Sequence, residues 1–259
     1  MIFLDVVTRH GNSTAPAGGV VKKDTLFRDP STARKPFTFD SAVVDVFADM
    51  IGRSVPIYQQ TLTMARWLAA NAVTDGTAIY DLGCSEGAAL AAACDGLTAP
   101  NVKLVGIDNS AAMLASCERR LRDVTHTVEL INADIATVEF APASLIMLNF
   151  TLQFVAPDAR DALLARAAAA LVPGGALLLS EKIRADSKRV DAVLINRHED
   201  FKRENAYSEL EIARKRESLE NVLIPDTTSE LLTRLSRAGL PDHGVWLQTF
   251  NFLSIVALK

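Results

Sequence analysis

The chain of 259 residues is long enough for one α/β domain with a well-buried core, and its hydrophobic content of 49% argues against general disorder. Its 27 lysines and arginines against 31 aspartates and glutamates give a net charge of -4, which argues against a protein that grips nucleic acid through phosphates. Three cysteines, without a Cys-X-X-Cys pair, argue against a disulfide framework and predict no metal site.

The first 23 residues are rich in Gly, Ser, Thr and Ala, and we expect a flexible tail before a single domain over residues 24–259. Asp5 and Arg9 interrupt the opening apolar run well before it reaches the length of a signal-peptide core. No segment approaches the roughly 20 apolar residues that a membrane span needs. We therefore expect a cytoplasmic protein without membrane contact.

A helix is expected over residues 40–53, and short apolar runs then alternate with longer helical segments. This alternation predicts βαβ units and a doubly wound, mostly parallel sheet. Five runs have the length of buried parallel strands, at 77–82, 103–108, 127–132, 144–150 and 176–180. The helices between them are expected at 88–95, 110–124 and 157–171, the last beginning with Pro157 and stopped by Pro173-Gly174-Gly175.

The end of the chain breaks this alternation. Residues 245–251 and 252–258 leave no room for a helix between them, so they predict an antiparallel pair at the sheet edge. Residues 184–222 form a helical insertion in which Ser208 and Glu211 have capping-box spacing. Insertions at this point lie at the carboxyl ends of the strands, where ligands bind, so we interpret this one as a lid. The predicted fold is Rossmann-like, with seven strands, helices on both faces and Trp67 and Trp246 in the core.

The sharpest motif is Asp81-Leu82-Gly83-Cys84-Ser85, which follows the first strand and opens a helix. Gly83 lacks a Cβ, so the backbone can turn tightly and approach a ligand. The helix start offers free N–H groups and a positive dipole end to a carboxylate. Asp81 is expected to face a cationic amine or sulfonium.

The next strand ends also carry polar groups. Asp108 is suited to accept both hydroxyls of a ribose. Asp134 can accept from an adenine amino group while Ile135 packs on the ring, and Asn149 reaches the same rim from the fourth strand. A single aspartate at a strand end is as typical of a helix cap as of a ligand contact, but four such strand ends together favour a ligand site. The pattern predicts binding of S-adenosyl-L-methionine.

Two other classes of enzyme share part of the glycine motif. A dinucleotide site needs G-x-G-x-x-G, whereas Gly83, Ser85 and Ala88 occupy these positions and leave no room for a pyrophosphate. Gly83-Cys84-Ser85-Glu86-Gly87 fits the serine-hydrolase string, but His198 and His243 lie in weak contexts for a catalytic triad. The methionine-derived cofactor remains the favoured ligand.

Longer blocks of the chain, from about Asp24 to the C-terminus, resemble the carboxy-S-adenosyl-L-methionine synthases within the class I S-adenosylmethionine-dependent methyltransferase superfamily. The blocks are Asp24-Thr25-Leu26-Phe27, Phe39-Asp40, Met50-Ile51, Arg53-Ser54-Val55-Pro56, Asp81-Leu82-Gly83-Cys84-Ser85, Ile107-Asp108-Asn109-Ser110, Leu148-Asn149-Phe150-Thr151-Leu152-Gln153-Phe154, Pro173-Gly174-Gly175, Leu179-Ser180-Glu181-Lys182, Asp200-Phe201-Lys202-Arg203, Tyr207-Ser208-Glu209-Leu210-Glu211-Ile212, Lys215-Arg216 and Leu219-Glu220-Asn221-Val222. Glu86 and the segment Asn196-Arg197-His198-Glu199 depart from the family pattern.

The resemblance implies an unusual transferase that converts S-adenosylmethionine and prephenate to carboxy-S-adenosylmethionine and phenylpyruvate. The product then serves a separate enzyme that modifies a tRNA wobble uridine to the 5-oxyacetyl form, so no direct nucleic acid binding is expected. The resemblance implies Arg216 as the group that holds the new carboxylate, supplied by the neighbouring subunit of a homodimer. The implied cofactor contacts are Tyr58, Gly83, Cys84, Ser85, Asp108, Asn109, Asp134, Ile135 and Asn149.

The implied reaction requires cationic side chains that bind carboxylates more than it requires side chains that transfer protons. Prephenate loses carbon dioxide and hydroxide, a base removes a proton from the sulfonium methyl, and the resulting ylide captures the carbon dioxide. A bidentate arginine suits a new carboxylate, although Arg216 also has the spacing to pair with Glu220. Arg53 is a candidate to bind a prephenate carboxylate. Alternatively, it is a surface arginine at a helix end that faces the C-terminal dipole. A small-molecule methyltransferase and a non-catalytic cofactor-binding protein remain as alternatives.

Overall fold

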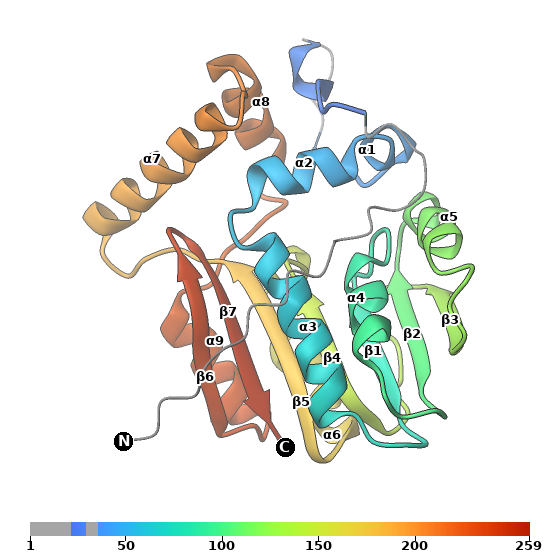
Figure 1. Cartoon of the computed structure of the whole chain (residues 1–259). Coiled ribbons are helices and arrows are strands. Elements are labelled where there is room, and N and C mark those ends of the chain that lie inside the picture. The colour runs from blue at the N-terminus through green and yellow to red at the C-terminus, as the bar shows by residue number, and fades with distance from the viewer. Residues whose placement is uncertain (1–21, 30–35) are drawn as a thin grey trace, which may run out of the picture.

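The computed structural model describes residues 22–29 and 36–259, and these form a sheet covered by helices (Figure 1). Seven strands follow the order β3-β2-β1-β4-β5-β7-β6. The first five are parallel, while β7 is antiparallel to both β5 and β6. The strands are β1 Ala78–Leu82, β2 Lys103–Asp108, β3 Thr127–Asn132, β4 Ala143–Asn149, β5 Leu171–Lys182, β6 Asp242–Thr249 and β7 Phe252–Leu258. The predicted fold class, including the antiparallel C-terminal pair, is confirmed.

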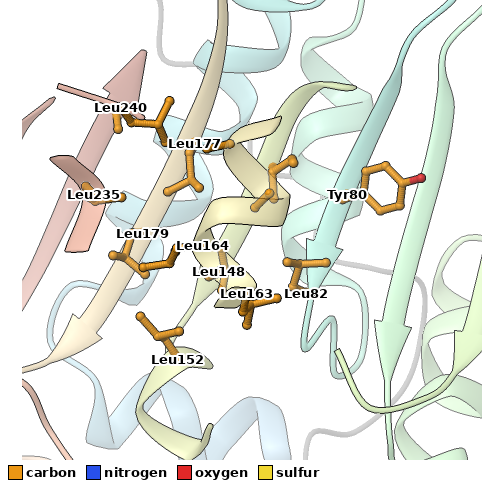
Figure 2. Packing of buried hydrophobic residues seen from close by; sticks show 14 of the residues in the cluster. Tyr80, Leu82, Leu148, Leu152, Leu163, Leu164, Leu177, Leu179, Leu235 and Leu240 are labelled. Carbon is orange, nitrogen blue, oxygen red and sulfur yellow. The ribbon is translucent and has the colours of Figure 1, made fainter. Parts of the chain in front are cut away.

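Helices cover both faces of the sheet because neighbouring strand residues point to opposite sides. Ile79 packs with α3 Tyr58–Ala72, α4 Ala88–Gly96 and α5 Ala111–Arg120. Tyr80 belongs to the core on the other side, which α6 Arg160–Ala170 and α9 Thr228–Arg237 cover. Figure 2 shows this second core around Leu148, Leu163 and Leu179.

The remaining helices, including the short η1 Leu26–Arg28, lie beyond the carboxyl ends of the parallel strands (Figure 1). The predicted helix 40–53 is divided into α1 Ser41–Val44 and α2 Phe47–Ser54, with Asp40 accepting from the N–H groups of Ala42 and Val43. The predicted lid insertion contains α7 Lys188–Glu204 and α8 Glu209–Leu219, which we call the lid helices. The expected capping box at the start of α8 is present, formed by Ser208 and Glu211.

Three details of the sequence prediction are wrong. Helix α6 begins at Arg160 and not at Pro157, and the Pro173-Gly174-Gly175 segment lies inside β5, where the register with β4 shifts between Ala143 and Leu145. Trp67 is 58% exposed, because the buried face of α3 is formed by Thr61, Ala65, Leu68 and Ala69. Trp246 is half-buried against the core and donates its Nε1–H to Ser254 Oγ at 2.8 Å.

The prediction of a flexible tail over residues 1–23 lies mostly outside the described residues. Lys22, at the start of the described part, forms an exposed ion pair with Asp45 at 2.7 Å. Over the part of the chain that the structure describes, no helix has the length and apolar content needed to cross a bilayer.

The core predicts a clear contrast between two substitutions. Leu148 is fully buried in the sheet, so Leu148→Ala should lower the free energy of unfolding by about 2–5 kcal/mol. Trp67→Ala, on the solvent side of α3, should change it by only about 0.5 kcal/mol. Urea denaturation measures both, and equal losses in the two variants would contradict the described packing.

Candidate functional site

A cavity of about 1230 Å³ lies between the carboxyl ends of the parallel strands and the helices beyond them. The structure brings together, in its lining, every residue that the sequence predicted as a cofactor contact. These residues are Tyr58, Asp81, Gly83, Cys84, Ser85, Asp108, Asn109, Asp134, Ile135, Asn149 and Arg216. Arg53 is not among the lining residues.

The turn after β1 requires glycine at its first position. Gly83 has φ of 80°, and a Cβ there would approach Thr151 Cγ2 to 2.4 Å. The N–H groups of Gly83 and Cys84 both donate to the carbonyl of Ile107, at 2.8 and 3.0 Å. The Cys84 side chain packs in the core, so Cys84 contributes to the cavity through its backbone. These bonds tie the turn to β2 and fix its position beside the cavity.

Two buried carboxylates lie at the tips of the adjacent strands β1 and β2. Burial, followed by the charge of Asp108, raises the pKa of Asp81 to about 7. Burial also raises the pKa of Asp108, against two hydrogen bonds at 2.9 Å from the N–H groups of Ser85 and Ser110. A cationic or hydroxyl-bearing ligand would relieve this excess of buried negative charge.

Asn149, at the tip of β4, has an unused hydrogen-bond donor. Its Oδ1 accepts from Ser180 Oγ at 3.0 Å, whereas its buried Nδ2 has no partner among the described residues. Buried polar atoms are rarely left unpaired in proteins, so this amide fits a ligand acceptor in the cavity. The side chain supports the prediction that β4 contributes to a ligand site.

The third strand contributes a residue pair with two roles. Asp134 is exposed and accepts from the N–H of Ala136 at 2.9 Å, as a turn-capping aspartate does. Ile135, beside it, is buried and lines the cavity. The capping alternative and the ligand-binding alternative are therefore compatible at this position.

Tyr58 and Glu86 close the side of the cavity next to Asp81. Burial raises the pKa of the Tyr58 hydroxyl, which therefore stays protonated and can donate to a ligand. Glu86, a departure from the family pattern, accepts from Ser116 Oγ at 3.1 Å and pairs with Arg120 at 3.5 Å. Helix α5 thus neutralises the extra carboxylate.

Arg53 has a structural position that the sequence did not reveal. Its guanidinium donates to Asp49 Oδ2 and to the backbone carbonyls of Asp24 and Asn205, at 2.5–3.1 Å. It also stacks on the Tyr207 ring, 4.0 Å from the centroid. The bond to Asp49 lies within α2, and the other contacts join α2 to the N-terminal segment and the lid. They do not support the prediction that Arg53 binds a substrate carboxylate.

Arg216 lies at the rim of the cavity and is 67% exposed. Its Nη1 donates to Glu199 Oε1 of α7 at 3.1 Å, in place of the pairing with Glu220 that the helical spacing allowed. Arg216 lines the cavity of its own chain. The resemblance, by contrast, implied that it acts in the site of a neighbouring subunit.

Sequence reasoning missed a group of cations in the cavity lining, one at the tip of β5 and two on the lid helices. Lys182, Lys202 and Lys215 all line the cavity. Burial, followed by the charges of the neighbouring lysines, lowers the pKa of Lys202 to about 8. Burial lowers the pKa of His198 to about 3, and its neutral ring contacts the carbonyl of Ser54 at 2.8 Å. Each lysine lies in a block that carried the family resemblance, and this was the signal that could have identified them.

A buried carboxylate positions the floor of the cavity. Glu181 accepts from the N–H groups of Thr151, Leu152 and Gln153, at 2.8–3.2 Å. These bonds hold the short helix η3 Leu152–Phe154 directly after β4, and burial raises the pKa of Glu181 to about 8.

The comparisons with known proteins agree with this geometry. A family model described as a methyltransferase domain matches residues 79–175. An O-methyltransferase family protein from Burkholderia thailandensis has a similar structure, with a TM-score of 0.62 and 16% identity over 88% of this chain and 66% of that one. The sheet order and the cavity at the strand tips therefore define a protein of the class I methyltransferase fold.

Sequence relatives identify the family within this class. The carboxy-S-adenosyl-L-methionine synthase of Shewanella amazonensis is 48% identical over 92% of this chain and 99% of its own length. The synthase of Enterobacter sp. (strain 638) is 46% identical over 92% of this chain and 97% of its length. The chain belongs to the carboxy-S-adenosyl-L-methionine synthase family, which confirms the resemblance and the interpretation of the chain as a transferase enzyme.

Proposed function

We propose that the protein converts S-adenosylmethionine and prephenate to carboxy-S-adenosylmethionine and phenylpyruvate. The observation that carries this proposal is one cavity lined both by buried carboxylates, at the tips of β1 and β2, and by cations, at the tip of β5 and on the lid helices. The sulfonium of S-adenosylmethionine complements the carboxylates, and an organic dianion complements the cations. Family membership supports the same reaction.

The strand tips divide the binding of S-adenosylmethionine among them. Asp108 accepts the ribose hydroxyls, and Ile135 packs on adenine beside Asp134. The turn at Gly83 and the start of α4 accommodate the amino-acid end, where Asp81 faces the positive charge. The remaining contacts are those of Tyr58, Cys84, Ser85, Asn109 and Asn149.

The proposed reaction balances without a metal or an external base. Prephenate breaks its bonds to the ring carboxyl and the ring hydroxyl, and so releases carbon dioxide, hydroxide and phenylpyruvate. Hydroxide takes a proton from the sulfonium methyl and forms water. The carbon that lost the proton bonds to carbon dioxide. The protein must hold two substrates together, exclude bulk water and stabilise the new carboxylate, for which Arg216 is the proposed ligand.

One incubation separates this proposal from its alternatives. The protein is incubated with S-adenosylmethionine in the presence or absence of prephenate, and the products are read by mass spectrometry. The proposal expects the cofactor to gain one carboxyl group only when prephenate is present. Release of S-adenosylhomocysteine with a methylated acceptor would indicate a methyltransferase. Binding without any turnover of either compound would indicate a non-catalytic protein.

The raised pKa of Asp81 predicts pH-dependent binding of S-adenosylmethionine. A cationic ligand favours the ionised carboxylate of Asp81, and the pKa of this carboxyl in the protein without ligand is about 7. Affinity should therefore fall about tenfold per pH unit as the pH drops below about 7, and should level off above it. Calorimetric titrations at several pH values measure this profile. Asp81→Asn should bind more weakly and lose the dependence, whereas an unchanged profile in that variant would assign it to another group.

The proposal includes a homodimer and a place in RNA modification. The lid helices expose Val190, Val193 and Leu210, each more than half accessible, which supports contact with a second copy near Arg216. The product would be used by a separate enzyme to modify a tRNA wobble uridine. The acidic composition supports the expectation that this chain does not itself bind RNA.

A further inference from the structure

Three lysine side chains meet in the cavity although they come from three separate elements. Lys182 ends β5, Lys202 lies in α7 and Lys215 lies in α8. Across residues 22–29 and 36–259, Lys215 Nζ makes one hydrogen bond, to Ser54 Oγ at 3.0 Å, and none of the three ammonium groups forms an ion pair. We call these residues the lysine trio.

Like charges of this kind destabilise one another in a half-buried cavity. Burial and the other two lysines lower the pKa of Lys202. Burial lowers the pKa of Lys215 to about 8, where the charges of Arg53 and Lys182 oppose those of Asp24 and Asp49. The pKa of Lys182 is also lowered, mainly by burial. A bound anion would remove this penalty, so the arrangement is typical of an anion site.

Carboxylates lie near the lysine trio and partly offset its charge, but none of those that the structure describes forms an ion pair with it. Glu199 pairs with Arg216 at 3.1 Å and with Arg203 at 3.6 Å, while Asp49 is bound by Arg53. The other carboxylates that face the trio or contribute to its electrostatics belong to Asp24, Asp191, Glu217 and Glu220.

An uncharged aromatic surface lies beside the lysine trio. The Phe252 ring packs edge-on against the His198 ring, with centroids 4.8 Å apart, and against Phe150 at 6.2 Å. All three residues line the cavity. Since His198 is neutral, the surface offers packing to an apolar ring without another charge.

We infer that Lys182, Lys202 and Lys215 together bind the two carboxylates of the co-substrate, with its ring against Phe252. This inference rests on the proposed function, because it assigns a location to the prephenate dianion. It also explains product release. Phenylpyruvate retains one carboxylate, so it leaves part of the lysine trio unpaired and binds more weakly than prephenate.

The test replaces each lysine separately by methionine, which keeps most of the aliphatic stem and removes the charge. Each variant should raise the KM for prephenate and the Kd for prephenate by about tenfold or more, as loss of a charge-assisted hydrogen bond does. The Kd for S-adenosylmethionine should change less than about threefold. Wild-type protein should bind prephenate more tightly than phenylpyruvate in calorimetry.

Lys188→Met is the matched control, because Lys188 is an exposed lysine on the same helix as Lys202. It should leave both constants unchanged, and thermal melts check that all variants fold. If the wild type forms carboxylated product and the trio variants keep a normal KM for prephenate, the lysine trio is not its site although the proposed function stands. If the wild type forms no product but binds prephenate, and the variants lose that binding, the anion site stands and the proposed function fails.

Discussion

Replacing Arg216 by alanine is expected to reduce formation of carboxylated product at least about a hundredfold, because the new carboxylate loses its bidentate partner. The Kd for S-adenosylmethionine should stay within about threefold of wild type, since the strand-tip contacts remain. Product is measured by mass spectrometry and binding by calorimetry. Arg189→Ala, an exposed position on α7, serves as the control and should behave as wild type. Equal product from Arg216→Ala would remove this arginine from the mechanism.

A mixing experiment shows whether Arg216 acts in its own chain or in a partner's site. Arg216→Ala is mixed with Asp108→Ala and the subunits are allowed to exchange. Activity is assayed at an S-adenosylmethionine concentration near the wild-type Kd, at which the weakened site of Asp108→Ala stays nearly empty. If Arg216 reaches a neighbouring site, half of the dimers carry one intact site, and about a quarter of wild-type activity returns. This recovery is the expected result. No recovery in mixed dimers would place Arg216 in the site of its own chain.

The second large effect is expected from Asp108→Ala, which should weaken binding of S-adenosylmethionine by about 10- to 150-fold. Hydrogen bonds to a charged group contribute about 1.5–3 kcal/mol, and the ribose hydroxyls lose such an acceptor. Asp108 also accepts from the N–H of Ser110, at the start of helix α5. Thermal melts detect a shift of that helix, which would also weaken binding.

Ser110→Ala is the control for that local structure. The Ser110 side chain caps α5 and donates to the carbonyl of Phe39 at 2.5 Å, so its removal disturbs the same turn while keeping the carboxylate. It should weaken binding of S-adenosylmethionine less than about threefold. Equal losses in Asp108→Ala and Ser110→Ala would assign the effect to helix geometry and contradict ribose recognition by Asp108.

The strands and the strand-tip residues were predictable because both depend on local pattern. Apolar runs such as 103–108 and 127–132 match β2 and β3, and parallel strands bring their carboxyl ends to one edge. Asp81, Asp108 and Asn149 were therefore expected to lie together before their contacts were known. The position of each residue along its strand was sufficient for that expectation.

The meeting of the lysine trio and the role of Arg53 were not predictable in this way. Their environments depend on how α2, α7 and α8 pack across the strand tips, which no local spacing determines. Arg53 lies near Tyr58 in sequence, yet its guanidinium faces Asp49 and Tyr207. Lys202 and Lys215 resemble ordinary surface lysines of a charged helix until tertiary packing places them in one cavity. Trp67 shows the converse, a large apolar residue on the solvent side of its helix.

The most direct test of the central claim is a crystal structure of the protein with carboxy-S-adenosylmethionine bound. The account predicts ribose at Asp108, adenine beside Ile135, the amino-acid end at the Gly83 turn, and the added carboxylate facing Arg216. A ligand outside this cavity, or one whose added carboxylate points away from the cations, would contradict the account.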